Sequence, residues 1–321
     1  MPSSPNLDTT FGVVNISCGW VNGTSHTTGV QSNNAATSNE LLVACISYEA
    51  NGNPSGQEIT AFSCSLGSLT FSKLGYVQNT TSGGDGETLE VWAAPCSSQF
   101  NSGATNWSFS LTWSGYVDEC SITAFMLQGL NSISAPLDTS GSNPASAFNS
   151  TSTTPPTVSM TTSQADDLLI AVTGRAQNFA PTGTPGGWTN AGSNTDASGN
   201  ANEGINVDYM AVSSAGSQSY TNTNGTSDLS YASLLLAFTA NAGGGVTGTF
   251  APTEADDTFA GAGYVPATGT IAVTENVDTF AGVGYTSLTA ALAVTETPDT
   301  FAGVGYGPPA RSGRRRVFII S

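Results

Sequence analysis

Short runs of alternating apolar and polar residues recur along the first 240 positions of the chain. In NWSFSLTW (106–113), the aromatic and leucine side chains share one face, and the serine and threonine side chains share the other. Such alternation is typical of a β-strand with one face on a core and one face in water. ELLVACISYE (40–49) and SITAFML (121–127) are almost continuously apolar, which predicts strands in the middle of a sheet.

Clusters of Gly, Asn, Ser and Pro separate these runs, and no stretch of useful length shows helical periodicity. The order of segments also repeats, because ATSNELLVACIS (36–47) is matched by SQADDLLIAVTG (163–174) and similar segments follow each. We therefore predict an all-β fold in which residues 1–242 form a β-sandwich of about ten strands. Its topology is jelly-roll-like or duplicated, with repeats at about 27–135 and 153–240. Whether the halves form one sandwich or two stays open.

A nine-residue motif occurs three times near the end of the chain, at a spacing of 21 residues. Its copies are DDTFAGAGY (256–264), VDTFAGVGY (277–285) and PDTFAGVGY (298–306). TIAVTE predicts a strand, NVD a turn and TFAGVGY a second strand, so we expect short β-hairpin repeats over 249–310, after a glycine-rich linker at 243–248. One hairpin cannot bury its apolar face alone, but stacked units or units of neighbouring chains could share a core. The pattern indicates a stalk or spacer; an extended segment along a partner surface is the alternative.

The charge is low and uneven. Charged residues make up 9% of the chain, against about 25% in a typical globular protein. The net charge is -17, and only Lys73 and Arg175 are basic before position 311. Such a surface disfavours binding to nucleic acid and to anionic membranes.

The last 11 residues differ, because they join four arginines to an apolar run. The arginines could reach an acidic groove, and VFII could add as a strand to a partner's sheet. We predict a docking tail at 311–321. Its residues are Arg311, Arg314, Arg315, Arg316, Val317, Phe318, Ile319 and Ile320.

Catalytic motifs are scarce. His26 is the only histidine, and no Gly-x-Ser-x-Gly motif accompanies it, so a serine triad is not expected. Paired carboxylates, as in glycosidases, leave one enzymatic route open. The candidate acids are Glu87, Glu90, Asp118, Glu119, Asp166, Asp167, Glu203 and Asp208. Nothing singles out a pair, so we expect no catalytic residues and no enzymatic activity.

The five cysteines, at 18, 45, 64, 96 and 120, lack the close spacing of a zinc or redox site. We expect small buried apolar side chains; one or two disulfides formed after cell lysis are the alternative. No cofactor or metal is expected. The acidic segment GGDGE (83–87) leaves calcium as an alternative, although the full EF-hand and nonapeptide calcium patterns are absent.

Sugar binding needs aromatic rings beside Asn, Ser and Asp side chains. Tyr116, in WSGYVDE, and Trp188, in PGGWTN, lie near predicted loops, and Trp113 begins the first of these segments. We predict Tyr116, Trp188 and Trp113 as glycan-binding residues. Trp107 is expected in the core, because aromatic side chains on an apolar strand face usually pack inside.

Several segments resemble β-sandwich modules that are common in uncharacterised bacterial and bacteriophage proteins: LEVWAAP, SITAFMLQGLNSISAPLD, TTSQADDLLIAV and YASLLLAFTA. The VTExxDTFAGVGY repeats are similar to tandem repeats of phage and prophage surface proteins. The resemblance implies a non-enzymatic virion structural protein, a head decoration, head fibre or tail fibre component. Its partners would be other virion proteins, copies of itself and host polysaccharide, and it brings no catalytic residues.

We therefore expect synthesis in a host cytoplasm and a place on the virion surface. The N-terminal segment MPSSPNLDTTFGVV lacks the basic start and apolar core of a signal peptide, and ASLLLAF is too short to span a bilayer. The alternatives are a bacterial carbohydrate-binding protein and a polysaccharide depolymerase. Association with particles, or release of reducing sugar, would distinguish them.

Overall fold

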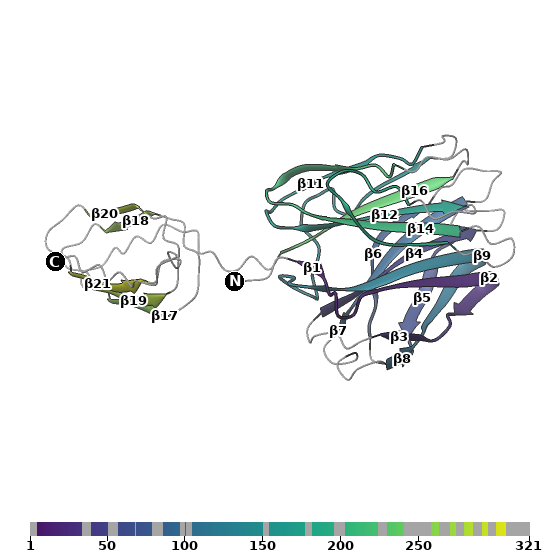
Figure 1. The fold of residues 1–321 in the computed structure, drawn as a ribbon, viewed down its shortest axis with the longest axis horizontal. Coiled ribbons are helices and arrows are strands. Elements are labelled where there is room, and N and C mark those ends of the chain that lie inside the picture. The colour runs from purple at the N-terminus through teal and green to yellow at the C-terminus, as the bar shows by residue number, and fades with distance from the viewer. Residues whose placement is uncertain are drawn as a thin grey trace, which may run out of the picture. The chain divides into compact units, whose positions relative to one another are not determined.

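The structure is a computed structural model, in which two compact units hold residues Ser3–Asn241 and Ala242–Ser321. We call them the sandwich unit and the repeat unit. The described residues are 5–33, 40–50, 57–67, 69–78, 86–96, 100, 105–149, 154–176, 182–195, 203–223 and 230–240, with five strands between 258 and 305. All their regular structure is β, as predicted (Figure 1). This described part of the chain contains no helix that could cross a membrane.

The first half of the sandwich unit forms a seven-stranded antiparallel sheet. Its strands are β1 (Asn6–Leu7), β2 (Val13–Thr27), β4 (Glu40–Ala50), β5 (Ile59–Cys64), β6 (Ser72–Gln78), β7 (Gly86–Cys96) and β9 (Phe109–Gln128). They lie in the order β1–β9–β4–β7–β6, and β2 and β5 also pair with the long strand β9. A separate two-stranded ribbon consists of β3 (Gln31–Asn33) and β8 (Thr105–Trp107).

The second half forms a five-stranded antiparallel sheet. Its strands are β10 (Ala145–Asn149), β12 (Leu168–Ala176), β13 (Thr189–Thr195), β14 (Glu203–Ala211) and β16 (Tyr231–Phe238). They lie in the order β10–β16–β12–β14–β13. A two-stranded ribbon of β11 (Val158–Thr162) and β15 (Gly216–Tyr220) accompanies this sheet.

The two sheets share one strand order, since β9–β4–β7–β6 in the first corresponds to β16–β12–β14–β13 in the second. β4 and β12 carry the two Leu-Leu segments that match in sequence. The backbone N–H of Asp8 donates to the Met126 carbonyl at 2.9 Å, and that of Asp138 donates to the Ala237 carbonyl at 2.9 Å. The surrounding sequences, NLDTT (6–10) and PLDTS (136–140), also match. The structural correspondence thus begins before the positions that sequence comparison suggested.

The inner faces of the two sheets pack against each other. This shared core contains Leu41, Val43, Cys45, Leu89, Val91, Phe125 and Leu127 from the first sheet, and Leu168, Ile170, Val172, Ile205, Val207, Leu234, Leu236 and Phe238 from the second. Removal of these side chains from water is the main stabilising contribution to the contact between the sheets. The two halves therefore form one sandwich with a common core.

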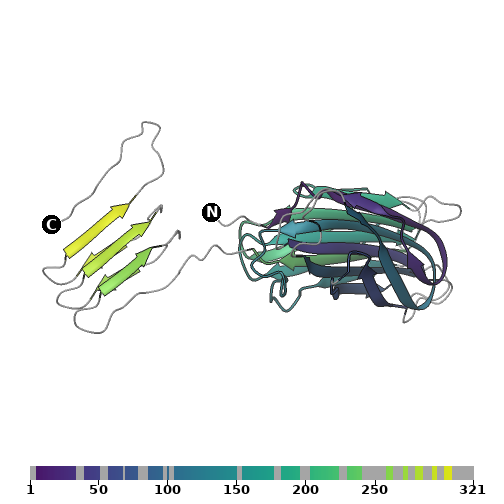
Figure 2. The ribbon, with the colours of Figure 1, turned by 90° about the horizontal axis from the view of Figure 1, so that it is seen from below.

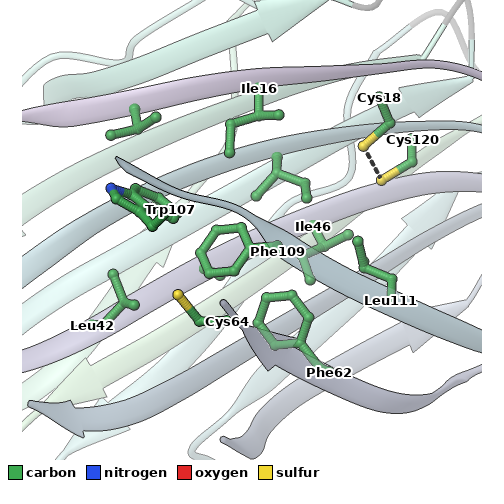
Figure 3. Close-up of a cluster of buried hydrophobic side chains, with 14 of the residues drawn as sticks. Ile16, Cys18, Leu42, Ile46, Phe62, Cys64, Trp107, Phe109, Leu111 and Cys120 are labelled. Atoms are coloured by element: carbon green, nitrogen blue, oxygen red, sulfur yellow. Dashed lines mark hydrogen bonds between the residues drawn. The ribbon is translucent and has the colours of Figure 1, made fainter. Parts of the chain in front are cut away.

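Each sheet also has a second apolar layer on its outer face. Leu42 and Ile46 of β4 pack there with Phe62, Trp107 and Phe109 (Figure 3). On the second sheet, Leu169 and Ala171 pack with Val158, Met160 and Tyr220 of the β11–β15 ribbon. Because β4 and β12 are buried on both faces, their sequences are continuous apolar runs and not alternating ones.

In the repeat unit, identical segments pair with one another. β17 (Thr258–Ala262), β19 (Thr279–Gly284) and β21 (Thr300–Gly305) form a parallel sheet, seen as three parallel arrows in Figure 2. β18 (Thr270–Val273) and β20 (Ala291–Val294) form a second parallel sheet. Each residue lies opposite its own copy, so that Phe259 pairs with Phe280 and Phe280 pairs with Phe301.

The prediction of β-hairpins is therefore wrong for these strands. A hairpin would pair β18 with β19, but the chain alternates between the two sheets, as in a β-solenoid. An isolated hairpin is marginally stable in water, whereas stacked copies hydrogen-bond along a continuous ladder. A 21-residue period lets every copy repeat the same register, which a hairpin arrangement does not use.

Candidate functional site

The structure separates the three predicted glycan-binding residues. Trp113 is only 3% exposed, and its ring meets that of Tyr48 edge-on with centroids 5.9 Å apart. The apolar alternation that begins at Phe109 continues through Trp113, which turns its side chain into the core. The prediction of Trp113 as a sugar-binding residue is wrong, because a buried ring cannot stack on a sugar. Trp107 lies in the core, as expected.

Trp188 is half-buried in the second half of the sandwich unit, just before β13. Its ring contacts the ring of Tyr220 edge-on, with centroids 4.8 Å apart. It therefore covers the apolar layer under the β11–β15 ribbon. Tyr116, by contrast, belongs to β9 of the first sheet, so the two candidates lie on different sheets.

Tyr116 is the most accessible of the predicted residues, with 40% of its surface exposed. Its hydroxyl hydrogen-bonds to Oδ1 of Asn22 on the neighbouring strand β2. Trp20, two residues before Asn22, is 51% exposed. Trp20, Asn22 and Tyr116 thus place two exposed aromatic side chains and an amide on one pair of strands. We call these three residues the aromatic ribbon.

Sequence reasoning missed Trp20, because the alternation along β2 points the wrong way. Ile16 and Cys18 face the core, and simple alternation would bury Trp20 as well. The pairing of β2 with β9 shifts between Ser17 and Trp20 and again after Trp20. Gly19 has a φ of +70° at the first shift. Such bulges redirect the following side chains, and the Gly-Trp-Val-Asn-Gly sequence was the available signal.

The aromatic ribbon has the chemistry of a sugar-binding surface. The faces of the Trp20 and Tyr116 rings can pack against the C–H face of a pyranose ring. The Asn22 amide and the half-buried Asp118 of β9 supply polar groups for hydroxyls. The hydrogen bond between Tyr116 and Asn22 fixes the phenol ring before a ligand arrives, which lowers the entropy lost on binding.

The sequence-predicted acids include one pair that the fold brings together. Glu87 of β7 lies opposite Glu49 of β4, and Glu203 of β14 lies opposite Ala176 of β12. These are equivalent positions in the two halves. The Ser47 hydroxyl is 2.5 Å from Oε1 of Glu87 and also hydrogen-bonds to Oε1 of Glu203. Ser47 was not a candidate, and its match to Gly174 in the repeat was the only signal for it.

Both glutamates are fully buried. Burial raises the pKa of Glu87 to about 8, although its hydrogen bonds to Glu203 and Ser47 act in the opposite direction. Burial, followed by the charge of Glu87, raises the pKa of Glu203 well above its ordinary value. The pair therefore retains protons at neutral pH. A polysaccharide cannot reach either carboxyl in this arrangement, so the pair does not provide a glycosidase site.

Glu90 is a second buried acid with a different environment. Its carboxylate accepts hydrogen bonds from the Tyr48 hydroxyl at 2.8 Å and from the Trp92 indole at 2.6 Å. The backbone N–H of Ile59 donates at 2.8 Å, and Nζ of Lys73 lies 3.0 Å away. Four donors satisfy this carboxylate, which therefore joins β4, β5, β6 and β7 and is not available to a substrate.

A third acidic pair lies where the second half begins. Asp138 accepts hydrogen bonds from the backbone of Ser163 at 2.6 Å and of Ser140 at 2.9 Å. Burial would raise the pKa of Asp138, but these bonds outweigh it and lower the pKa. Burial, with a hydrogen bond to Asp138, raises the pKa of Asp167 to about 7. One ionised and one protonated carboxyl thus share this turn.

The remaining candidates have varied environments. Asp208 accepts hydrogen bonds from the Tyr220 hydroxyl at 2.8 Å and from the Asn190 amide at 3.0 Å, inside the second half. Glu119 is buried and Asp166 is exposed. His26 is half-buried in β2, opposite Leu111.

The described residues contain no group of three His, Cys, Asp or Glu side chains that could hold a metal ion. Residues 83–85 of the acidic segment, the linker at 243–248 and the tail at 311–321 lie outside the described residues. The predicted docking side chains therefore stay a prediction. They are Arg311, Arg314, Arg315, Arg316, Val317, Phe318, Ile319 and Ile320.

Comparison with known proteins finds no matching family model, no matching curated protein and no matching solved structure.

Proposed function

We propose that this protein is a non-enzymatic structural protein on the surface of a bacteriophage particle, as a head decoration, head fibre or tail fibre component. In this proposal the sandwich unit contacts host glycans through the aromatic ribbon. The repeat unit and the basic tail attach the protein to other virion proteins and to copies of itself. The sequence resemblance to phage and prophage surface proteins supports the proposal.

The in-register pairing of β17, β19 and β21 is the observation that carries it. Each strand of this sheet uses an identical strand as its neighbour, so the unit grows by repetition without any new specificity. Repetition of this kind serves assembly, whereas an active site needs one asymmetric set of groups. Neighbouring strands lie about 4.8 Å apart, so three copies make a short stack and not a long stalk. The geometry thus favours attachment over spacing.

The buried acids and the low charge are consistent with a binding role. Glu87, Glu203 and Glu90 are all inaccessible and have structural partners. The exposed features of the described sandwich unit are instead aromatic and amide side chains, with Trp20 51% exposed. Such side chains suit recognition of a neutral, hydroxyl-rich polymer.

Particles of the phage that encodes the chain provide the test. The full-length protein should be present at a fixed copy number in purified particles, measured by quantitative mass spectrometry. A chain lacking residues 242–321 should fold, because the sandwich unit has its own cores, but should be missing from the particles. Normal incorporation of the truncated chain would contradict attachment through the repeat unit and tail.

A free bacterial carbohydrate-binding protein is the second candidate, and the exposure of Trp20 favours it as much as it favours a virion protein. In that case the purified chain would bind host polysaccharide, and the full-length protein would not associate with particles.

A further inference from the structure

Cys18 of β2 and Cys120 of β9 face each other across two neighbouring strands. Their Sγ atoms are 2.9 Å apart, and Figure 3 shows the two sulfurs pointing toward one another. Ser17 pairs with Ser121, so the next residues on the two strands come directly opposite each other. Directly opposed residues of antiparallel strands have Cα atoms about 4.5–5.5 Å apart, within the range that a disulfide spans.

We propose that Cys18 and Cys120 form a disulfide bond when the protein enters oxidising surroundings. The sulfurs must approach by about 0.9 Å to reach the length of an S–S bond, which side-chain rotation can supply. This proposal does not depend on the glycan-binding role of the aromatic ribbon.

The other three cysteines have different surroundings. Cys45 faces the shared core between the sheets, away from the other four cysteines, which lie in the outer core of the first sheet. The thiol of Cys96 donates to the Ala94 carbonyl at 3.6 Å. Burial raises the pKa of the Cys64 and Cys96 thiols, which lowers the fraction of reactive thiolate. Cys64 and Cys96 form the competing pair that an experiment must distinguish.

The oxidant would be a small disulfide such as oxidised glutathione. Cys18, which is 7% exposed, loses its proton and attacks one glutathione sulfur, forming a mixed disulfide and releasing one reduced glutathione. The thiolate of the buried Cys120 then attacks the Cys18 sulfur and releases the second glutathione. The two cysteine protons pass to the two glutathione thiolates, and the two electrons of the new bond reduce the oxidant.

The bond would strengthen the weakest part of the β2–β9 pairing. Between Ser17 and Ser25 the register shifts three times, and each shift interrupts the hydrogen-bonded ladder. The bond would close a loop between residues 102 apart in sequence, which restricts the unfolded chain. It would also hold Trp20 and Tyr116 on a fixed pair of strands.

The full-length reduced protein, incubated with oxidised glutathione, tests this proposal. Remaining thiols are then alkylated with N-ethylmaleimide, and the protein is digested without reduction. The expected products are a linked peptide pair containing Cys18 and Cys120, and alkylated peptides for Cys45, Cys64 and Cys96. The oxidised protein should melt several degrees higher than the reduced protein, and the difference should vanish on adding dithiothreitol.

Cys18→Ala should abolish both the linked peptide and the rise in melting temperature, whereas Cys45→Ala should keep both. The peptide map of the unaltered protein decides the question even if a variant fails to fold. Alkylation of both Cys18 and Cys120 after full oxidation would overturn the proposal. A link between either of them and another cysteine would overturn it as well.

Discussion

Glu87 and Glu203 occupy equivalent positions in the two halves of the sandwich unit, and the Ser47 hydroxyl lies between their carboxyl groups. The position equivalent to Ser47 in the second half is Gly174. A Cβ atom at Gly174 would lie 2.0 Å from Oε1 of Glu87 and 2.5 Å from Oγ of Ser47. The two halves therefore meet at a point where one carries a hydroxyl and the other must carry no side chain.

The buried glutamates should make the protein more stable in mild acid than at alkaline pH. Folded Glu87 keeps its proton to about pH 8, whereas its ordinary pKa is 4.5. Between these values the folded state binds more protons than the unfolded chain, so the free energy of unfolding falls as pH rises. The slope is about 1.4 kcal/mol per pH unit for each proton. Denaturant unfolding at several pH values between 5 and 8 measures it.

Glu87→Gln and Glu203→Gln should each flatten this dependence, because the amide does not titrate. Glu58→Gln is the matched control, since Glu58 is exposed and pairs with Lys73 at the surface. Asp167, whose pKa is about 7, adds a contribution of the same sign in all these variants. An unchanged slope in both buried-site variants would contradict the raised pKa values.

Gly174→Ala should destabilise the sandwich unit, by about 1–3 kcal/mol or more, because the added methyl group overlaps the Glu87 carboxyl and the Ser47 hydroxyl. Gly186→Ala is the control, since a Cβ there meets no atom within 4 Å. Denaturant unfolding of the two variants provides the comparison. Equal stabilities would show that the contact between the sheets relaxes without cost.

Exchanging the two residues tests the equivalence of the halves more directly. Gly174→Ser combined with Ser47→Gly moves the hydroxyl to the opposite sheet and removes the group that it would overlap. The double variant should be more stable than Gly174→Ser alone, with a coupling energy of about 0.5–3 kcal/mol in a double-mutant cycle. Simple additivity of the two changes would contradict the arrangement.

Trp20→Ala and Tyr116→Ala should weaken binding to host polysaccharide at least tenfold while changing stability little, because both side chains are substantially exposed. Trp113→Ala should instead lower the free energy of unfolding by about 3–5 kcal/mol, as expected for a buried aromatic side chain. Titration calorimetry with polysaccharide and thermal melting separate the two effects. Full binding by a Trp20→Ala, Tyr116→Ala double variant would exclude the aromatic ribbon as the sugar-binding surface.

Lys73→Met should cost about 1.5–3 kcal/mol, because it removes the cation that pairs with the buried Glu90 carboxylate at 3.0 Å. Adding Glu90→Gln should recover part of the loss, since a neutral amide needs no cation. Chemical denaturation of the single and double variants gives the measurement. A double variant that is less stable than Lys73→Met would show that the other donors to Glu90 matter more than Lys73.

Deleting residues 277–297 removes one 21-residue copy and should leave the repeat unit folded, because β17 would then pair with β21 in the same register. Deleting residues 277–287 should disrupt it, because the two sheets would no longer receive matching segments. Circular dichroism and limited proteolysis distinguish these outcomes. Equal protease sensitivity of the two deletions would contradict parallel stacking.

Alternation and turn residues were enough to predict the β class, the central strands β4 and β12, and the core position of Trp107, because these depend on local periodicity. Alternation failed at Trp20 and Trp113. At Trp20, bulges change the side that faces water, and a bulge depends on the partner strand β9. At Trp113, the alternation itself was right, and the error lay in expecting a loop where β9 continues.

The sequence by itself thus determined which segments form strands and that both the first 240 residues and the C-terminal segment contain copies. Only the tertiary structure decided how the copies meet. It pairs the 21-residue copies in parallel, and it packs the two halves face to face so that Glu87 reaches Glu203. Periodicity reports which face of a strand is apolar, but pairing between segments far apart in the chain depends on shape and hydrogen bonding across the whole assembled core.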